Sequence, residues 1–189
     1  MRHDIFPTPI WHIEETPQVL VDELYKGAYR FKKKYPSATK TNCGGYQSPV
    51  FDWEEFQPQG REYINDTVRD AFAKEVSRND SLGTVELPPD TDFKVIGWWY
   101  NINGQGHWNT PHTHPFSDLA LVLYVTDSDG LLTFMNPHAQ RGTSKQNSSV
   151  NAKKGDIVIF PSDLVHYVMP NPREEDRISI SMNLQLCWY

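Results

Sequence analysis

The chain has 189 residues, of which 38% are hydrophobic and 22% are charged, and its mean hydropathy is −0.60. This length suits one domain that buries roughly two-thirds of its unfolded surface, which excludes a disulfide-stapled mini-protein. The net charge of −6 disfavours binding to duplex DNA or to anionic lipid. No apolar run approaches the roughly 20 residues that cross a bilayer, so we expect no membrane association.

The two cysteines, Cys43 and Cys187, form neither a CxxC motif nor a paired framework. This usage is typical of a reducing compartment. The first residues also lack the apolar core of a signal peptide. We therefore expect a cytoplasmic protein, and the sequence favours no particular oligomeric state.

The first part of the chain, residues 1–90, predicts an extended opening followed by two helices. Prolines restrict residues 5–12 to extended geometry. Helical spacing of apolar residues then predicts helices over residues 17–34 and 54–76. The apolar positions are Val19, Leu20, Leu24, Ala28 and Phe31 in the first helix and Ile64, Val68, Phe72 and Val76 in the second. Two glycines between the helices predict a loop over residues 42–46.

The second part, residues 91–189, follows the pair Pro88-Pro89 and reads as short strands separated by turns. The expected strands are residues 93–102, 119–125, 131–135, 148–152, 156–160, 165–169 and 177–186, with a polar loop over residues 140–149. Seven or eight strands at this spacing predict a sandwich, barrel or jelly roll. We expect a mainly β, single domain over residues 1–189, with the two helices against the outside of one sheet.

Three of the seven histidines stand in a pattern that suits a metal site. His112 and His114 are two residues apart, and such residues project to the same side of an extended segment. His166 follows a strand and a turn that passes Pro161, which can bring a third imidazole across a barrel. Three imidazoles suit Fe, Zn, Cu or Ni and leave coordination positions open for catalysis. We expect only packing or surface roles for the remaining histidines, which are His3, His12, His107 and His138.

The segment from Arg177 to Leu184 alternates strictly between polar and apolar side chains. One face should therefore pack on hydrophobic structure while the other is polar. If the polar face lined a barrel, Arg177 would be costly to bury without an anion, and its guanidinium would suit a carboxylate together with the hydroxyl of Ser179. The alternative is an edge strand with a solvated polar face, on which Arg177 pairs with Glu174 or Asp176.

Together these motifs resemble those of the Fe(II)- and 2-oxoglutarate-dependent oxygenases, and more narrowly a largely uncharacterised oxygenase family of phage and marine bacteria. The matching motifs are Trp99-x-Asn101-x-Asn103, Asn109-x-x-His112-x-His114-Pro115, Tyr124-Val125, Gly155 to His166 and Arg177 to Asn183. The resemblance covers about residues 93–186 in order. Before Phe93 it rests only on residues 6–11 and 44–48.

The resemblance implies a double-stranded β-helix, which is a cupin-like jelly roll. It assigns Fe(II) to His112, His114 and His166, and the distal carboxylate of 2-oxoglutarate to Arg177 and Ser179, so that the three histidines and Arg177 form the catalytic set. Further contacts with this cosubstrate are expected from Asn101, Asn109 and Asn183. Such enzymes use O2 to convert 2-oxoglutarate to succinate and CO2 and couple this to oxidation of a substrate C–H bond. The prime substrate stays open among peptides, nucleobases and metabolites.

Two positions depart from the usual pattern of these oxygenases. The common ligand set contains a carboxylate, whereas position 114 is histidine. Three neutral ligands leave the full +2 charge on the metal, which favours anionic co-ligands; alternatively Asp118 is the second ligand and His114 lies behind it. The second departure is Ala120-Leu121, where relatives often carry Ser-Gly, and it concerns the shape of the substrate pocket.

Two other functions remain open from the sequence. Residues 106–118 and 155–166 nearly reproduce the two motifs of cupins, which share the jelly-roll architecture and include metalloenzymes without a 2-oxo acid. An inward Arg177 would distinguish the oxygenase, because a simple cupin has no need of it. The third function is a non-catalytic, capsid-type binding module whose histidines hold a structural metal.

Overall fold

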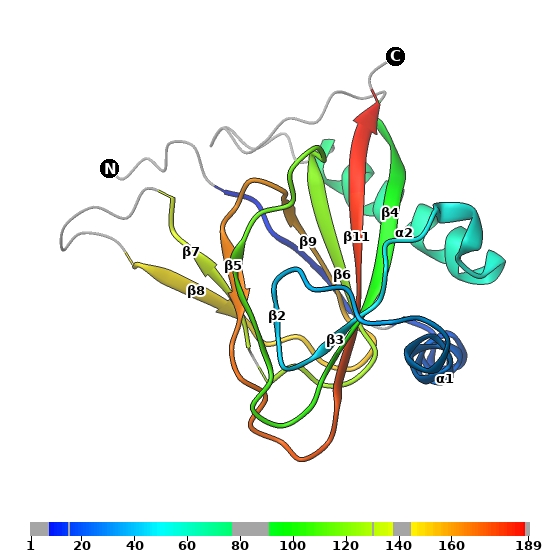
Figure 1. The fold of residues 1–189 in the computed structure, drawn as a ribbon. Helices are drawn as coiled ribbons and strands as arrows, with labels where there is room; N and C mark the ends of the chain where they lie inside the picture. Colours follow the sequence, from blue (N-terminus) through cyan, green and yellow to red (C-terminus); the bar gives the residue numbers. More distant parts are fainter. Residues whose placement is uncertain (1–7, 15, 77–90, 130, 138–144, 188–189) are drawn as a thin grey trace.

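The computed structural model describes residues 8–14, 16–76, 91–129, 131–137 and 145–187 (Figure 1). The helices are α1 (Gln18–Lys34) and α2 (Pro58–Val76), with a short 3-10 helix at Trp53–Glu55. The strands are β1 (Trp11–Ile13), β2 (Asn42–Cys43), β3 (Tyr46–Gln47), β4 (Asp92–Asn103), β5 (Trp108–His112), β6 (Leu119–Tyr124), β7 (Leu132–Met135), β8 (Asn147–Val150), β9 (Ile157–Pro161), β10 (His166–Val168) and β11 (Arg177–Cys187).

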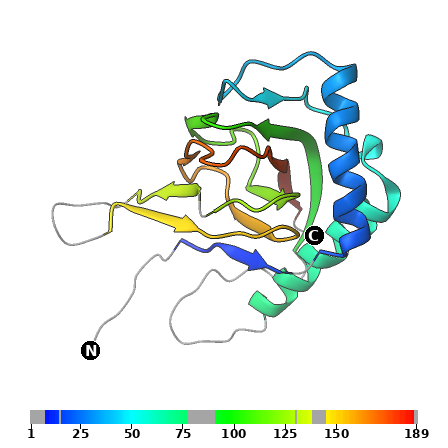
Figure 2. The ribbon, with the colours of Figure 1, turned by 90° about the horizontal axis from the view of Figure 1, so that it is seen from below.

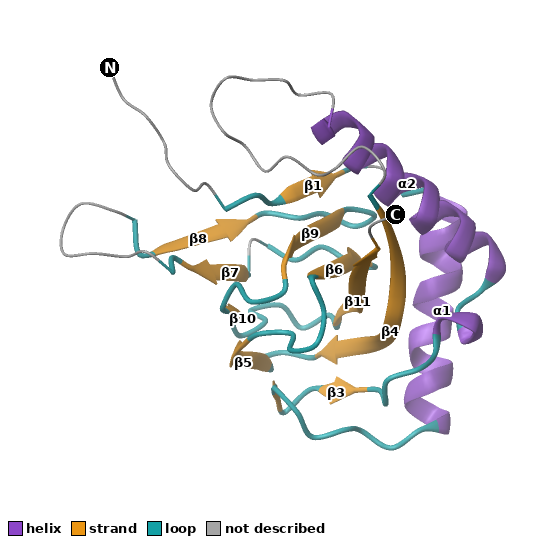
Figure 3. Cartoon of the chain, turned by 90° about the horizontal axis from the view of Figure 1, so that it is seen from above, coloured by secondary structure: helices purple, strands orange, loops and turns teal. Residues whose placement is uncertain are grey.

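The strands form two antiparallel sheets that face each other as a jelly roll (Figure 3). The larger sheet has the order β1-β9-β6-β11-β4-β3, and the smaller has the order β2-β5-β10-β7-β8. Strand β11 therefore lies inside the larger sheet, where β4 and β6 pair with its two sides. The fold class predicted from the sequence is confirmed.

Both helices cover the outer face of the larger sheet, as Figure 2 shows from below. Their buried residues pack into one cluster with apolar side chains of β4, β6, β9 and β11. The cluster includes Leu20, Val21, Leu24 and Ala28 from α1 and Ile64, Val68 and Phe72 from α2. The predicted helices and their position are thus confirmed, although α2 begins at Pro58, a residue favoured in the first helical turn.

The buried face of α1 differs from the prediction at one residue. Val19 is 74% exposed, because it lies about 100° around the helix from Leu20, and Val21 occupies the buried position instead. Phe31 is half-buried against the same cluster, whereas the side chain of Val76 lies outside the described part of the chain.

Strands β6 and β9 of the larger sheet are buried on both faces, which explains their continuous apolar sequences. In β6 the residues Leu119, Leu121 and Leu123 face the helices, while Ala120, Val122 and Tyr124 face the smaller sheet. In β11 only one face is apolar, and its residues Ile178, Ile180, Met182 and Leu184 are all fully buried against the helices. The opposite, polar face of β11 consequently points between the two sheets.

Residues 42–46 do not form the predicted loop. They contain β2 and the start of β3, which pair with β5 in the smaller sheet and β4 in the larger one. The two glycines between them allow this change of sheet, since Gly44 has a φ of +80° and a Cβ on Gly45 would collide with Asn103. This segment therefore joins the two sheets at one edge of the molecule.

Strands β1 and β5 were not among the expected strands. The sequence of β5, Trp-Asn-Thr-Pro-His, carries polar residues and a proline that conceal a strand pattern. Strand β8 begins within the predicted polar loop. His3, Pro88-Pro89, His138 and residues 140–144 lie outside the described part. No helix of the described chain is long and apolar enough to cross a membrane.

Candidate metal centre

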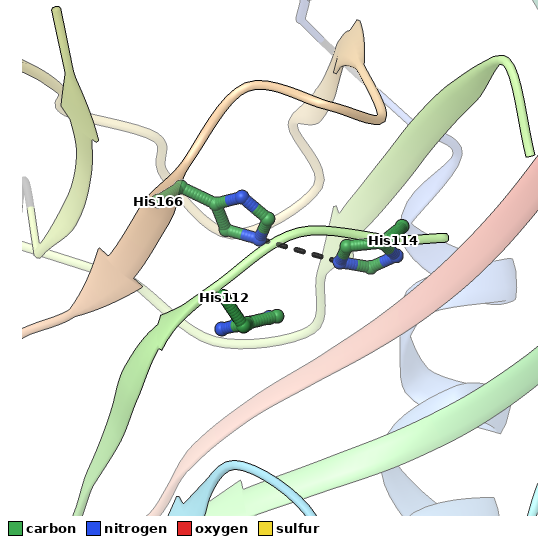
Figure 4. A group of neighbouring side chains, drawn as sticks. All are labelled: His112, His114 and His166. Carbon is green, nitrogen blue, oxygen red and sulfur yellow. Dashed lines mark hydrogen bonds between the residues drawn. The ribbon is translucent and has the colours of Figure 1, made fainter. Parts of the chain in front are cut away.

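Three histidine side chains meet between the two sheets, next to the ends of β5 and β10 (Figure 4). His112 ends β5 and lies directly opposite His166 in the antiparallel pairing with β10. His114 follows two residues after His112, in the segment that leaves β5. One ligand nitrogen from each ring lies within 4.8 Å of the other two. The convergence predicted from the spacing of these histidines is therefore present in the fold.

Each histidine is oriented by a hydrogen bond from its Nδ1 atom. The Nδ1–H of His112 donates to the carbonyl of Thr110 at 2.7 Å, and that of His166 donates to the carbonyl of Leu164 at 2.8 Å. The Nδ1–H of His114 donates to Oδ1 of Asn183 at 2.7 Å. Because all three partners are oxygen acceptors, the proton sits on Nδ1 and each Nε2 carries a free lone pair.

The lone pairs of two of these rings face each other. Nε2 of His114 and Nε2 of His166 are 3.3 Å apart, a contact that is repulsive unless a cation lies between them. Two nitrogens that bind one ion at about 2.0–2.1 Å stand roughly 3.0–3.4 Å apart. The donor set and its spacing therefore fit a shared metal ion.

Burial favours the neutral form of these imidazoles. It lowers the pKa of His112, and it lowers the pKa of His114 to about 4 and that of His166 to about 3. For His114 and His166, the neighbouring histidine rings decrease the pKa further. The hydrogen bond to Asn183 opposes the shift of His114 without cancelling it. Near neutral pH the three rings are thus unprotonated at Nε2, the state that a metal ligand requires.

The low histidine pKa values predict that the metal-free protein loses stability in acid. Between pH 6.5, the ordinary value for histidine, and about pH 4, the unfolded chain binds more protons than the folded one, so the free energy of unfolding falls as the pH falls. Urea unfolding at several pH values measures this slope. In the variant His166→Leu, the free energy of unfolding should depend less steeply on pH over the same range. An unchanged slope would contradict the lowered pKa of His166.

A cavity of about 310 Å³ adjoins the three histidines. Polar residues of β4 and β11 form much of its wall, and apolar residues of β6, β7 and β10 complete it. The polar residues include Asn101, Asn103, Arg177, Ser179, Ser181 and Asn183, and the apolar residues include Val122, Leu132 and Val168. None of the described residues that line the cavity is an aspartate or a glutamate. The cavity is therefore suited to a ligand with negative charge.

Arg177 brings a buried positive charge to this cavity. Its side chain is 4% exposed; Nη1 donates to the carbonyl of Met169 at 3.1 Å, and Nη2 has no partner. Burial lowers the pKa of the guanidinium to about 10, so it stays charged at neutral pH. A buried, incompletely paired cation is unfavourable unless an anion binds to it.

The edge-strand alternative for Arg177 is wrong. Strand β11 is internal to the larger sheet, and its polar face lines the cavity rather than bulk solvent. The carboxylate of Asp176 instead accepts a hydrogen bond from the hydroxyl of Tyr29 at 2.8 Å. Only an internal position explains why Arg177 is buried.

The other predicted cosubstrate residues all reach the cavity wall. Ser179 lies two residues beyond Arg177 on the same face of β11. The amide of Asn101 donates to the hydroxyl of Ser181 at 3.0 Å, and that of Asn109 donates to the hydroxyl of Thr41 at 3.1 Å. Asn183 contacts His114, so its observed role is to hold this ring.

Asp118 does not belong to the histidine cluster. Its carboxylate is exposed and accepts a hydrogen bond from the backbone N–H of Leu186 at 2.8 Å. The three ligand atoms that converge include His114 and not Asp118. Ala120 and Leu121, the second departure from the pattern, face the two apolar clusters and do not line the cavity.

The remaining described histidines have the packing roles expected of them. Nε2 of His12 lies 2.8 Å from the carboxylate of Asp156, which ties β1 to the turn before β9. Nδ1 of His107 accepts a hydrogen bond from the N–H of Gly104 at 3.1 Å in the turn between β4 and β5. Neither histidine joins the cluster.

Several cavity residues escaped the sequence interpretation. Trp99 lines the cavity and stacks on His114 with ring centroids 5.5 Å apart, whereas Trp98 is buried in the core. Lys40, Thr41, Gln47 and Val50 also line the cavity. In the sequence, only the stretch Gly-Gly-Tyr-Gln-Ser at residues 44–48 pointed to this segment. The segment reaches the site because β2 pairs with β5 and β3 pairs with β4.

Residues 97–183 match the model of a protein family described as "Putative 2OG-Fe(II) oxygenase". This region contains the three histidines, Arg177 and most of the cavity wall. The match supports the resemblance to the Fe(II)- and 2-oxoglutarate-dependent oxygenases at the level of the superfamily. No curated protein sequence matches the chain.

Solved structures of low sequence identity have the same fold. A prolyl-4-hydroxylase from Pseudomonas putida has a TM-score of 0.64 and 16% identity, over 94% of this chain and 92% of that one. HygX from Streptomyces hygroscopicus, solved with nickel and 2-oxoglutarate, has a TM-score of 0.65 and 12% identity, over 94% and 83% of the two chains. A viral collagen prolyl hydroxylase from Paramecium bursaria Chlorella virus-1, solved with 2-oxoglutarate, has a TM-score of 0.60 and 14% identity, over 93% and 94%. The chain thus has the double-stranded β-helix fold.

Proposed function

We propose that this chain is a non-haem Fe(II)- and 2-oxoglutarate-dependent oxygenase, acting as a hydroxylase. The observation that carries the proposal is the buried, incompletely paired guanidinium of Arg177 in the cavity that adjoins three converging histidines. A histidine metal site alone would suit a cupin equally well. The added cation requires an anionic ligand, and 2-oxoglutarate supplies a carboxylate at the end opposite the one that chelates metal.

In this proposal His112, His114 and His166 hold Fe(II) through Nε2, and Arg177 with Ser179 binds the distal carboxylate of 2-oxoglutarate. When bound, the metal and this cosubstrate supply the oxidising chemistry: O2 converts 2-oxoglutarate to succinate and CO2 while a substrate C–H bond is oxidised. Three neutral ligands leave the +2 charge of the metal uncompensated by protein, which strengthens its attraction for the dianionic cosubstrate.

The residues of the chain orient the reactants and exclude water. Arg177 is fixed by Met169 and by its place within the larger sheet, so its second nitrogen is free to pair with a carboxylate. The apolar side chains of Leu132 and Val168, from the smaller sheet, line the cavity across from the polar strands, and Val122 of β6 adds an apolar side chain beside Ser181. A dry wall of this kind strengthens the ion pair between Arg177 and its ligand.

The prime substrate in this proposal is a peptide side chain, a nucleobase or a metabolite. The structural neighbours include a prolyl hydroxylase in complex with a peptide fragment and a protein solved with hygromycin B, so one fold accommodates both peptides and small molecules. The acidic chain disfavours duplex DNA as the substrate.

An anaerobic titration tests the proposal directly. Fe(II) is added to the metal-free protein and then 2-oxoglutarate is added, while the visible charge-transfer absorption of a chelated 2-oxo acid is monitored. A saturable band is expected. Metal binding without a band would favour the cupin alternative, and no metal binding would favour a non-catalytic jelly-roll module.

Replacing His114 by aspartate tests whether position 114 is a ligand. A carboxylate can bind the same metal but lowers the net charge of the site by one, so we expect His114→Asp to retain Fe(II) and to bind 2-oxoglutarate more weakly than the natural protein. Calorimetric titration measures both affinities. The variant His114→Ala should lose metal affinity; equal metal binding by both variants and the natural protein would show that position 114 is not a ligand.

A further inference from the structure

We propose that Asn183 is a positioning residue, which selects the metal-binding tautomer of His114. The inference rests on the proposed function and concerns a different part of it, the control of one ligand by a side chain behind it. It starts from the hydrogen bond of 2.7 Å between Nδ1 of His114 and Oδ1 of Asn183.

His114 is held differently from the other two histidines. His112 and His166 each donate Nδ1–H to the backbone carbonyl two residues earlier, and no side-chain substitution can remove such a partner. His114 alone depends on a side chain, and this side chain comes from a strand 69 positions away in the sequence. The tautomer of His114 is therefore set by tertiary structure rather than by its own segment.

The surroundings of His114 divide its constraints into two kinds. Trp99 stacks on the ring at an interplanar angle of 28°, and Phe160 meets it edge-on with centroids 6.2 Å apart. The backbone N–H of His114 donates to the carbonyl of Ser162 at 2.8 Å. These contacts fix the plane of the ring, but none of them chooses which nitrogen carries the proton. The oxygen of Asn183 makes that choice, since it can only accept.

Asn183 is itself held rigidly. It lies in β11, where its backbone is opposite Gly97 of β4 on one side and Ala120 of β6 on the other. The β-bulge in this region begins after Asn183, so the alternation from Arg177 to Asn183 stays in phase. Asn183 therefore shares one face of one strand with Arg177, and a single strand orients both a metal ligand and the anion-binding residue.

The choice of asparagine has an electrostatic consequence. An aspartate at position 183 would accept the same hydrogen bond, but its negative charge would make His114 a stronger donor to the metal and would reduce the net positive charge of the site. Histidine at position 114 and asparagine at position 183 both leave the metal at its full charge. This matches a cavity in which no described lining residue is acidic and whose proposed ligand is an anion.

Three variants test the inference: Asn183→Ala, Asn183→Asp and the matched control Gln185→Asp. Gln185 is exposed on the same strand, two residues beyond Asn183. Co(II) affinity is measured by calorimetry on the metal-free proteins, the Co(II) absorption spectrum reports the ligand environment, and 2-oxoglutarate affinity is then measured on the Co(II)-loaded proteins. Thermal unfolding of each metal-free variant checks that it is folded.

We expect Asn183→Ala to weaken Co(II) binding by about 10- to 100-fold, the usual effect of removing the partner of a ligating histidine. The nearly isosteric Asn183→Asp should bind Co(II) at least as tightly as the natural protein, with an altered spectrum, while its affinity for 2-oxoglutarate falls. Gln185→Asp should change neither affinity. This opposite effect on the two ligands separates an electronic role from simple packing.

The inference would be overturned if Asn183→Ala bound Co(II) as tightly as the natural protein does. It would also be overturned if Asn183→Asp lost as much Co(II) affinity as Asn183→Ala. The proposed function fails separately if the natural protein binds Co(II) but not 2-oxoglutarate, because the Co(II) measurements still decide the role of Asn183. Failure of the natural protein to bind Co(II) would overturn both.

Discussion

Replacing His166 by alanine is expected to abolish metal binding at micromolar metal concentrations. The side chain is 2% exposed and its Nε2 is 3.3 Å from that of His114, so its loss removes one of three ligands and leaves no other side chain of the cluster to replace it. Two imidazoles at an otherwise uncharged site give far weaker binding than three. Calorimetric titration with Fe(II) under anaerobic conditions, or with Co(II), measures the loss.

The matched control for His166 is His107→Asn. His107 lies in the turn between β4 and β5 and makes one hydrogen bond through Nδ1, but it does not belong to the histidine cluster. The metal affinity of this variant should equal that of the natural protein. Thermal unfolding checks that His166→Ala is folded. If this folded variant still bound metal tightly, His166 would not be a ligand of the proposed metal site.

Replacing Arg177 by alanine is expected to weaken 2-oxoglutarate binding by about 30- to 4,000-fold, which corresponds to about 2–5 kcal/mol for a buried charge pair. The cause is the loss of the only arginine among the described residues of the cavity wall. Metal affinity should be unchanged, because no atom of Arg177 belongs to the histidine cluster. The measurement is a titration of the Fe(II)-loaded, oxygen-free protein with 2-oxoglutarate.

Arg173→Ala is the matched control for Arg177. Arg173 lies four residues earlier on the exposed loop before β11, where it forms ion pairs with Asp127 and Asp129. Its removal should leave the affinity for 2-oxoglutarate unchanged, since exposed ion pairs contribute little. A natural affinity in Arg177→Ala would show that the buried guanidinium has a structural role and that the carboxylate binds elsewhere.

The sequence predicted the parts of this fold that rest on local periodicity. The apolar face of α2 at Ile64, Val68 and Phe72 is buried as its spacing indicates. The alternation in β11 also predicted which face packs on the helices and which is polar. In both cases the residues that define the pattern lie within one short segment of the chain, so the pattern can be recognised without knowing which element packs against it.

The parts that escaped prediction depend on pairing between distant segments. Strands β2 and β3 have only two residues each, and they exist because β5 and β4 offer backbone partners. The same pairing brings Gln47 to the cavity. In β4, strict alternation would place Trp99 on the same face as Phe93 and Val95. The bulge opposite Asn183 and Leu184 shifts the phase of the strand, so that Trp98 faces the helices and Trp99 faces the cavity.

The position of β11 inside the larger sheet fixes where its polar side chains lie along the cavity. Hydrogen bonding on both sides prevents it from sliding, and a shift by a single residue would turn Arg177 away from the cavity. The pairing therefore fixes the interval between Arg177 and Asn183, which holds His114. In the proposed complex, the register of this one strand would therefore set the separation between the two groups that bind the ends of the 2-oxo acid, so that backbone pairing rather than a surface loop would select ligands by length.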